Sequence, residues 1–232
     1  MAKDNILVLG SKPDSNLPDV EVKKIYTANG AAERAITYRK KYNNNILTCI
    51  TGASEFFRNE YVSKRIIDSK PQKLIIRSGV ISLPISLKNK TELNCISNKK
   101  QWLFQSNFFI LGKVSLILGE LNYYKSFFKS SFHTIKALKN KKLQGVSAGF
   151  YAILVAIFEN PNANIIISGI GMQGGKQFYK SERSNYFVYD SRARVDRFLI
   201  KKMKKNLKKN MYSLDEELVN TANITRWDNN RF

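Results

Sequence analysis

Small residues and one serine open the stretch of this sequence whose residue types could bind a ligand. Gly145-Val146-Ser147-Ala148-Gly149 leads directly into the apolar run Phe150–Phe158. A serine before an apolar run is typical of a helix N-cap, and small side chains leave the first backbone N–H groups of such a helix uncovered. Those donors suit a phosphate group. The stretch therefore indicates a nucleotide or phosphate site, although an ordinary buried helix–strand pair has the same pattern.

A short apolar strand follows this helix in the chain. Ile165–Ile167 is apolar on both faces, as a central strand of a parallel sheet is, and Ser168-Gly169-Ile170-Gly171 comes directly after it. Open α/β sheets bind ligands beyond the carboxyl ends of their strands. We therefore expect the glycines after this strand to lie beside the helix that begins at Ser147.

A polar segment rich in tyrosine comes next and is a candidate lid over that site. It covers about residues 172–190, with Gly174-Gly175 near its start. Phenols and cations on a closing loop can cover a substrate and exclude water. An aromatic surface loop that packs on the sheet is the alternative interpretation. The residues that suggest a lid are Lys176, Tyr179, Lys180, Arg183, Tyr186 and Tyr189.

The rest of the chain alternates between strand and helix patterns, which is typical of a parallel α/β sheet. Expected strands are Asn5–Leu9, Lys24–Ala28, Ile46–Ile50, Lys73–Ile76, Leu93–Ile96, Ile165–Ile167 and Met211–Leu214. Expected helices are about Ala31–Tyr42, Ser54–Ser69, Gln101–Phe109, Val114–Phe128, Ala148–Glu159 and Arg192–Asn206, with a helical turn from Asp215. No repeat, linker or domain boundary is evident, so we expect one domain over residues 1–232.

Composition fits a folded globular protein, with 43% hydrophobic and 12% aromatic residues. The first ten residues are typical of a strand that enters a glycine turn and not of a signal peptide. No apolar run approaches the ~20 residues that cross a bilayer. Cys49 and Cys95 lack metal-ligand spacing, so we expect buried free thiols in a reducing cytoplasm, and no metal site.

Charge is the unusual bulk property of the chain. It has 39 Lys and Arg against 18 Asp and Glu, a formal net charge of +21, which indicates a polyanionic neighbour. The densest cluster is Lys201–Lys209, and Phe198, Leu199, Met203 and Leu207 lie about one helical turn apart there. One face of this helix can dock while its lysines contact anionic lipid, or the lysines are simply solvated. The motifs of nucleic-acid-binding domains are absent, so no nucleic-acid partner is expected.

Short motifs resemble a known family in their order along the chain. Leu7–Pro13 resembles a first strand and glycine–proline turn, and Ile25–Asn29 a second strand that ends in asparagine. Ser147–Tyr151, followed by Ile167–Ile170, is similar to the pair that completes a CMP-binding cleft. This pattern resembles the bacterial lipooligosaccharide sialyltransferases (glycosyltransferase family 42) and related CMP-sugar transferases, and it covers most of the chain.

The resemblance implies a single Rossmann-like domain with a lid, which uses a CMP-activated acidic sugar and needs neither a metal nor another cofactor. The start of the helix at Ser147, Ala148 and Gly149 would hold the phosphate, and Tyr179 and Tyr186 would stabilise the departing phosphate. Independently, the sequence has no Asp-x-Asp motif, which agrees with stabilisation of the leaving group by N–H groups and phenols. The remaining residues implied for the nucleotide site are Gly10, Ser11, Asn29, Gly169, Ile170 and Gly171.

Two departures from the family pattern concern the chemistry. The family has an aspartate where this chain has Gly171, and a general-base histidine where this chain has Tyr189–Asp196. Asp190 is the candidate base for the acceptor hydroxyl, or alternatively a nucleophile that attacks the anomeric carbon. A third possibility is a protein that binds a nucleotide without transferring a sugar.

Other ionisable residues have less specific interpretations. Arg192 and Arg194 are candidates to meet a sugar carboxylate or phosphate, or to lie on a solvated helix face. Asp196 is expected to pair with Arg192 or with the lysines from Lys201 onward. His133, the only histidine, is expected to be a partly buried structural residue.

We therefore expect a transferase that moves sialic acid, Kdo or a similar 2-keto acid sugar from CMP to a glycan or glycolipid acceptor. Lipopolysaccharide or capsule biosynthesis in the cytoplasm, with peripheral contact to an anionic membrane, would fit this activity. One alternative is a pyrophosphokinase-like enzyme on the same sheet, which would require a triphosphate and magnesium. Another is a non-catalytic nucleic-acid-binding protein, favoured by charge alone.

Overall fold

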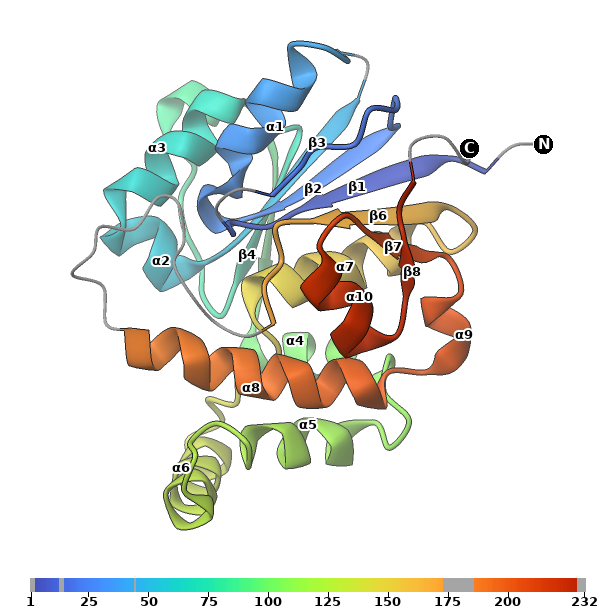
Figure 1. Ribbon diagram of the computed structural model, residues 1–232. Helices are drawn as coiled ribbons and strands as arrows, with labels where there is room; N and C mark the ends of the chain where they lie inside the picture. The colour runs from blue at the N-terminus through green and yellow to red at the C-terminus, as the bar shows by residue number, and fades with distance from the viewer. Residues whose placement is uncertain (1–2, 13–14, 44, 173–185, 229–232) are drawn as a thin grey trace.

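A sheet of eight parallel strands forms the centre of the molecule, in the order β5-β4-β3-β2-β1-β6-β7-β8 (Figure 1). This computed structural model describes residues 3–12, 15–43, 45–172 and 186–228, with 186–190 as helical backbone only. The predicted Rossmann-like α/β fold is confirmed. The strands are β1 (Asn5–Leu9), β2 (Lys24–Ala28), β3 (Ile46–Gly52), β4 (Lys73–Arg77), β5 (Glu92–Ile96), β6 (Asn164–Ser168), β7 (Met211–Ser213) and β8 (Thr225–Arg226).

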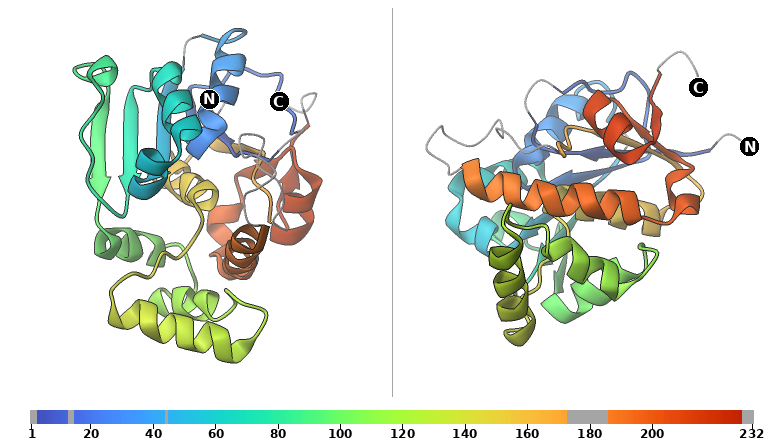
Figure 2. Two further views of the ribbon diagram at one scale, coloured as in Figure 1. Left: turned by 90° about the vertical axis from the view of Figure 1, so that its left-hand side faces the viewer. Right: turned by 60° about the horizontal axis from the view of Figure 1, so that its bottom comes forward.

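Helices cover both faces of this sheet (Figures 1 and 2). On one face lie α1 (Ala32–Arg39), α2 (Ala53–Arg58) and α3 (Glu60–Ser69), preceded by the 3-10 turn η1 (Asn29–Ala31). The other face is covered by α7 (Ala148–Glu159), beyond which α8 (Tyr186–Lys202) and then α5 (Lys113–Glu120) and α6 (Phe127–Lys139) lie. The remaining elements are α4 (Asn98–Ser106), α9 (Lys205–Lys208), α10 (Glu216–Ala222) and the 3-10 turn η2 (Ile85–Leu87).

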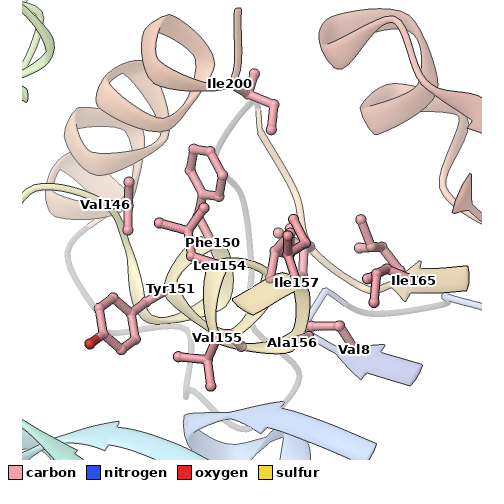
Figure 3. Close-up of a cluster of buried hydrophobic side chains, with 14 of the residues drawn as sticks. Val8, Val146, Phe150, Tyr151, Leu154, Val155, Ala156, Ile157, Ile165 and Ile200 are labelled. Atoms are coloured by element: carbon pink, nitrogen blue, oxygen red, sulfur yellow. The ribbon is translucent and has the colours of Figure 1, made fainter. Parts of the chain in front are cut away.

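Two hydrophobic cores, one on each face of the sheet, explain why its central strands are apolar throughout. In β1, Ile6 and Val8 face the core around α7, whereas Leu7 and Leu9 face the core around α1. Figure 3 shows α7 inside the first core, with side chains that point both toward the sheet and toward α8. Alternate residues of a strand point to opposite faces, so a strand covered on both sides needs apolar side chains at every position.

The order of the strands creates a reversal between β1 and β6. From β1 the chain builds the sheet outward through β2, β3 and β4 to β5 at one edge. It then returns through α4, α5, α6 and α7 to β6, on the other side of β1. Loops that leave β1 and β6 in opposite directions open a crevice at the carboxyl ends of the strands, where sheets of this class bind ligands.

Two of the expected helices are interrupted in the structure. The helix expected over Ser54–Ser69 is interrupted at Asn59, whose side chain accepts a hydrogen bond from the Val62 N–H (3.3 Å) and caps α3. The helix expected over Val114–Phe128 ends at Glu120, and α6 begins after the capping residue Ser126. In both cases a polar side chain that bonds to the backbone starts a new helix.

The predicted lid overlaps α8. Residues 186–190 belong to this helix, which begins earlier than the expected Arg192 and ends at Lys202, before the expected Asn206. Residues 173–185 lie outside the described part of the chain, so the lid stays a prediction. Within the described residues, none of the helices combines the length and the apolar character that crossing a membrane requires.

Candidate functional site

A cavity of about 510 Å³ lies at the carboxyl ends of the central strands, beside the loops that follow β1 and β6. Its wall contains all the residues implied for the nucleotide site, and also Arg192. The structure thus brings together loops that are far apart in the sequence. The residues that line the cavity are Gly10, Ser11, Lys12, Ala28, Asn29, Gly52, Ala53, Ser54, Glu55, Arg77, Ser78, Tyr123, Gln144, Val146, Ser147, Ala148, Gly149, Gly169, Ile170, Gly171, Arg192, Ala193 and Asp196.

Gly10 and Gly169 lie where the backbones after β1 and β6 touch. The Gly10 N–H donates to the Ser168 carbonyl (2.8 Å), and the Lys12 N–H donates to the Gly169 carbonyl (2.9 Å). A Cβ on Gly10 would lie 2.0 Å from the Gly169 carbonyl oxygen, and Gly169 itself has a φ of +76°. Both glycines are therefore required for this close approach, independently of any ligand.

Arg34 and Asp215 form hydrogen bonds that stabilise this contact between the backbones after β1 and β6. Arg34 donates to the Gly10 carbonyl (3.1 Å) and the Ser168 Oγ (3.1 Å), and Asp215 accepts from the Gly169 N–H (2.6 Å). Burial lowers the pKa of Arg34 and raises the pKa of Asp215, while their mutual attraction opposes both shifts. Neither residue lies in a motif, so neither was predictable from the sequence as part of this junction.

The first turn of α7 is open to the cavity. The Ser147 Oγ accepts from the Phe150 N–H (3.2 Å), which confirms Ser147 as the N-cap. Ser147, Ala148 and Gly149 are partly exposed, whereas Phe150–Ile157 are buried. The positive end of a helix of 12 residues thus forms part of the cavity wall, and such an end favours an anion.

Arg77, at the end of β4, adds a buried positive charge to this wall. Its Nε donates to the Gln101 Oε1 (3.2 Å), its Nη2 donates to the Val146 carbonyl (2.8 Å), and its guanidinium lies 4.5 Å from the centre of the Tyr151 ring. Burial lowers its pKa to about 10, which leaves it protonated at neutral pH. Within the described part of the chain, no carboxylate forms an ion pair with Arg77. The Asp196 carboxylate attracts Arg77 without forming an ion pair with it, and a bound anion would add a direct countercharge.

Arg192 also lines the cavity, but its charge is already paired. Its Nη1 donates to the Glu120 Oε1 (2.8 Å) and to the Gly145 carbonyl (2.5 Å), and its guanidinium lies 4.8 Å from the centre of the Tyr123 ring. The Glu120 side chain is only 1% exposed, so this ion pair is shielded from water. The expected pairing of Arg192 with Asp196 is therefore wrong, because the Arg192 guanidinium forms its ion pair with Glu120 of α5.

Asp196 is a buried ionisable residue of the cavity wall, where an ion-pair partner was expected. It is buried, and its Oδ1 accepts a hydrogen bond from the Ser147 N–H (2.9 Å) at the start of α7. Burial raises the pKa of Asp196 to about 6, against the hydrogen bonds from Ser147 and the charges of Arg192 and Arg77. Among the described residues Asp196 forms no ion pair, so the expected pairing with the lysines from Lys201 is also wrong. A carboxyl group with this pKa can exchange protons near neutral pH.

His133 does not line the cavity, but it contacts Tyr123, which does. Its Nε2 lies 3.8 Å from the Glu120 Oε2, and its ring stacks on Tyr123 with 4.5 Å between the ring centres. Burial lowers its pKa, and the nearby Arg192 acts in the same direction. The interpretation of His133 as partly buried is confirmed. Arg194 is turned to the loop before α6, where it donates to the Tyr123 carbonyl (2.7 Å).

The three residues proposed for catalysis are not placed by the structure. Tyr179 lies outside the described residues, and Tyr186 and Asp190 lie in the first turns of α8, where only the backbone is described. Asn29 is placed: its Oδ1 accepts from the Thr51 Oγ (3.0 Å) at the edge of the cavity. In the described ranges, no three His, Cys, Asp or Glu side chains are grouped so that they could hold a metal ion.

Comparisons of this chain with protein-family models, curated proteins and solved structures find no match, so the cavity itself is the basis for inferring a function.

Proposed function

We propose that this chain is a glycosyltransferase that moves a 2-keto acid sugar from a CMP-activated donor to a glycan or glycolipid acceptor. The observation that carries the proposal is the meeting of two anion-binding features in one cavity: the open N-terminus of α7 and the buried guanidinium of Arg77. The cavity lies at the strand reversal, and its size is in the range of small-molecule sites.

The charges of the proposed donor match these two features. A CMP-linked 2-keto acid sugar carries one negative charge on its phosphodiester and another on the sugar carboxylate. The N–H groups at Ala148 and Gly149 suit the phosphate, and Arg77 suits the second anion because its positively charged guanidinium can form a charge-assisted hydrogen bond with a carboxylate. Arg192 lies in the same wall, where its ion pair with Glu120 fixes its position.

In the proposed transfer, the acceptor hydroxyl oxygen bonds to the anomeric carbon, the bond from that carbon to the phosphate oxygen breaks, and CMP leaves. The N-terminus of α7 stabilises the negative charge that develops on the departing phosphate. We propose Asp196 as the group that takes the proton of the acceptor hydroxyl, because its raised pKa keeps it basic near neutral pH. Asp190 remains the alternative, either as this base or as a nucleophile, and the family resemblance implies that Tyr179 and Tyr186 would stabilise the departing phosphate.

Calorimetric titration is expected to show that the chain binds CMP without magnesium and prefers CMP to UDP, GDP and ATP. The cavity offers helix N–H donors and arginine for a phosphate, and the preference for cytidine follows from the family resemblance. Each nucleotide would be titrated with and without magnesium. Binding of ATP only with magnesium would contradict the transferase and favour a pyrophosphokinase-like enzyme. Absence of any nucleotide binding would contradict both.

Replacing Arg77 with glutamine is expected to weaken binding of CMP-linked sialic acid at least about tenfold, since a hydrogen-bonded buried charge is lost. Titration with CMP alone identifies the anion that Arg77 binds: affinity for CMP falls equally if it is the phosphate and stays unchanged if it is the sugar carboxylate. Arg65→Gln is the matched control, because Arg65 on α3 pairs with Glu33 on α1 outside the cavity. Unchanged affinity of the Arg77 variant for both ligands would remove Arg77 from the site.

A further inference from the structure

Helix α6 has its polar side buried and its apolar side exposed, the reverse of an ordinary surface helix. Ser130 and Thr134 are 0% and 2% exposed, and the Thr134 Oγ1 donates to the Ser130 carbonyl (2.8 Å). Large apolar side chains point to solvent instead, with Phe128 84% and Phe132 73% exposed. We call these side chains the α6 face: Phe127, Phe128, Phe132, Ile135 and Leu138.

The position of α6 leaves this face without a partner in the described part of the chain. Figures 1 and 2 show α5 and α6 as the outermost layer, separated from the sheet by α8. The turn before α5 and α5 itself also expose apolar residues, among them Ile110 (60%) and Val114 (52%). Keeping several phenylalanines in water is unfavourable, so a surface of this kind indicates a binding partner.

The charges around the α6 face indicate which partner it fits. No Asp or Glu occurs between Leu121 and Leu143, and every lysine in this segment is exposed. A second copy of the chain would bring two positive faces together, whereas an anionic lipid surface would neutralise them. The lysines that surround the α6 face are Lys125, Lys129, Lys136, Lys139, Lys141 and Lys142.

We propose that the α6 face docks on a bilayer that contains anionic lipids, with its phenylalanines at the boundary of the acyl chains and its lysines among the headgroups. The segment that carries this face begins next to Tyr123 and ends next to Gln144, and both residues line the cavity. Docking through α6 therefore brings the wall of the cavity close to the lipid surface. This inference does not depend on the proposed transfer, and its test contains no nucleotide.

The cluster Lys201–Lys209 is a weaker candidate for the same role. Leu199 and Met203, which the sequence analysis expected to dock, are 0% and 1% exposed and belong to the core of the protein itself. The exposed residues of this cluster are lysines and Asn206, so it offers charge without exposed apolar side chains. Insertion into a bilayer surface needs both, and α6 supplies both.

Co-sedimentation of the full chain with lipid vesicles tests the proposal. We expect the wild type to bind vesicles of phosphatidylcholine mixed with phosphatidylglycerol and to bind phosphatidylcholine alone far more weakly. Phe128→Ser with Phe132→Ser is expected to reduce the partition coefficient at least about tenfold, since two inserted rings are lost. Val80→Ser with Ile85→Ser is the matched control: these residues are 80% and 92% exposed outside α6, and binding should be retained.

Two results would overturn the assignment to α6. The first is vesicle binding that the phenylalanine variant retains and that neutralisation of Lys201, Lys202, Lys204 and Lys205 abolishes. The second is a wild type that does not bind vesicles but sediments as a dimer, together with a phenylalanine variant that sediments as a monomer. That pair of results would assign the α6 face to a second copy of the chain. Thermal melting of each variant verifies that it is folded.

Discussion

Replacing Gly10 with alanine is expected to lower the free energy of unfolding by about 3 kcal/mol. The added Cβ would lie 2.0 Å from the Gly169 carbonyl oxygen and 2.6 Å from the Ile170 Cγ1. These neighbours cannot simply rotate away, because the Gly169 backbone is held by Lys12 and by Asp215. Urea denaturation followed by circular dichroism measures the change, and nucleotide affinity should fall together with stability.

Gly52→Ala is the matched control for this prediction. Gly52 also lines the cavity, but a Cβ there would meet only the Glu55 Cβ at 4.0 Å, and its φ of −80° is open to any residue. Alanine at this position should leave stability unchanged or raise it by about 0.5 kcal/mol, because the unfolded chain loses freedom. Equal stability of the Gly10 and Gly52 variants would contradict the close contact between the loops after β1 and β6.

Replacing Asp196 with asparagine is expected to reduce the turnover of a CMP-linked sialic acid or Kdo donor about 100-fold or more, as loss of a general base does. An asparagine Oδ1 can still accept from the Ser147 N–H, so the start of α7 should be preserved. Release of CMP in the presence of an acceptor is the measurement. A variant that binds CMP normally but turns over slowly would locate the loss in the chemical step.

The pH dependence of turnover supplies an independent test of the role of Asp196. A base acts in its ionised form, and burial raises the pKa of this carboxyl group to about 6. Turnover by the wild type should therefore rise with pH through about 6 and level off above it, and Asp196→Asn should lack this rise. If Asp190→Asn abolishes turnover while Asp196→Asn leaves both the rate and the profile unchanged, Asp190 is the base and our assignment is wrong.

Local sequence patterns were enough to predict several elements with their bounds. The expected strands Asn5–Leu9 and Lys24–Ala28 and the expected helix Ala148–Glu159 agree with β1, β2 and α7. Each is a continuous apolar run bounded by polar or turn residues, so its ends are encoded nearby. Predictions were wrong at Asn59 and Ser126, where a capping side chain divides or starts a helix within a pattern that looks continuous.

The loops of the candidate site were also predictable, because the carboxyl ends of parallel strands meet at one edge of the sheet. Glycines after Leu9 and Ser168 and the serine before α7 marked that edge in the sequence. The signal for Asp196 was weaker but present: it lies four residues after Arg192, on the same side of a helix. Arg77 could have been noticed as a charged residue at the end of an apolar strand.

Residues close together in the chain encode the alternation of elements, the parallel sheet and the edge at which its glycine loops gather. The electrostatics of the site depend instead on how the elements pack. The pKa of Asp196 is raised because α8 buries it against Ser147, and Arg77 lines the cavity without an ion pair among the described residues. Burial and charge pairing join residues distant in sequence, as when Glu120 rather than Asp196 takes Arg192, so they depend on how the helices pack.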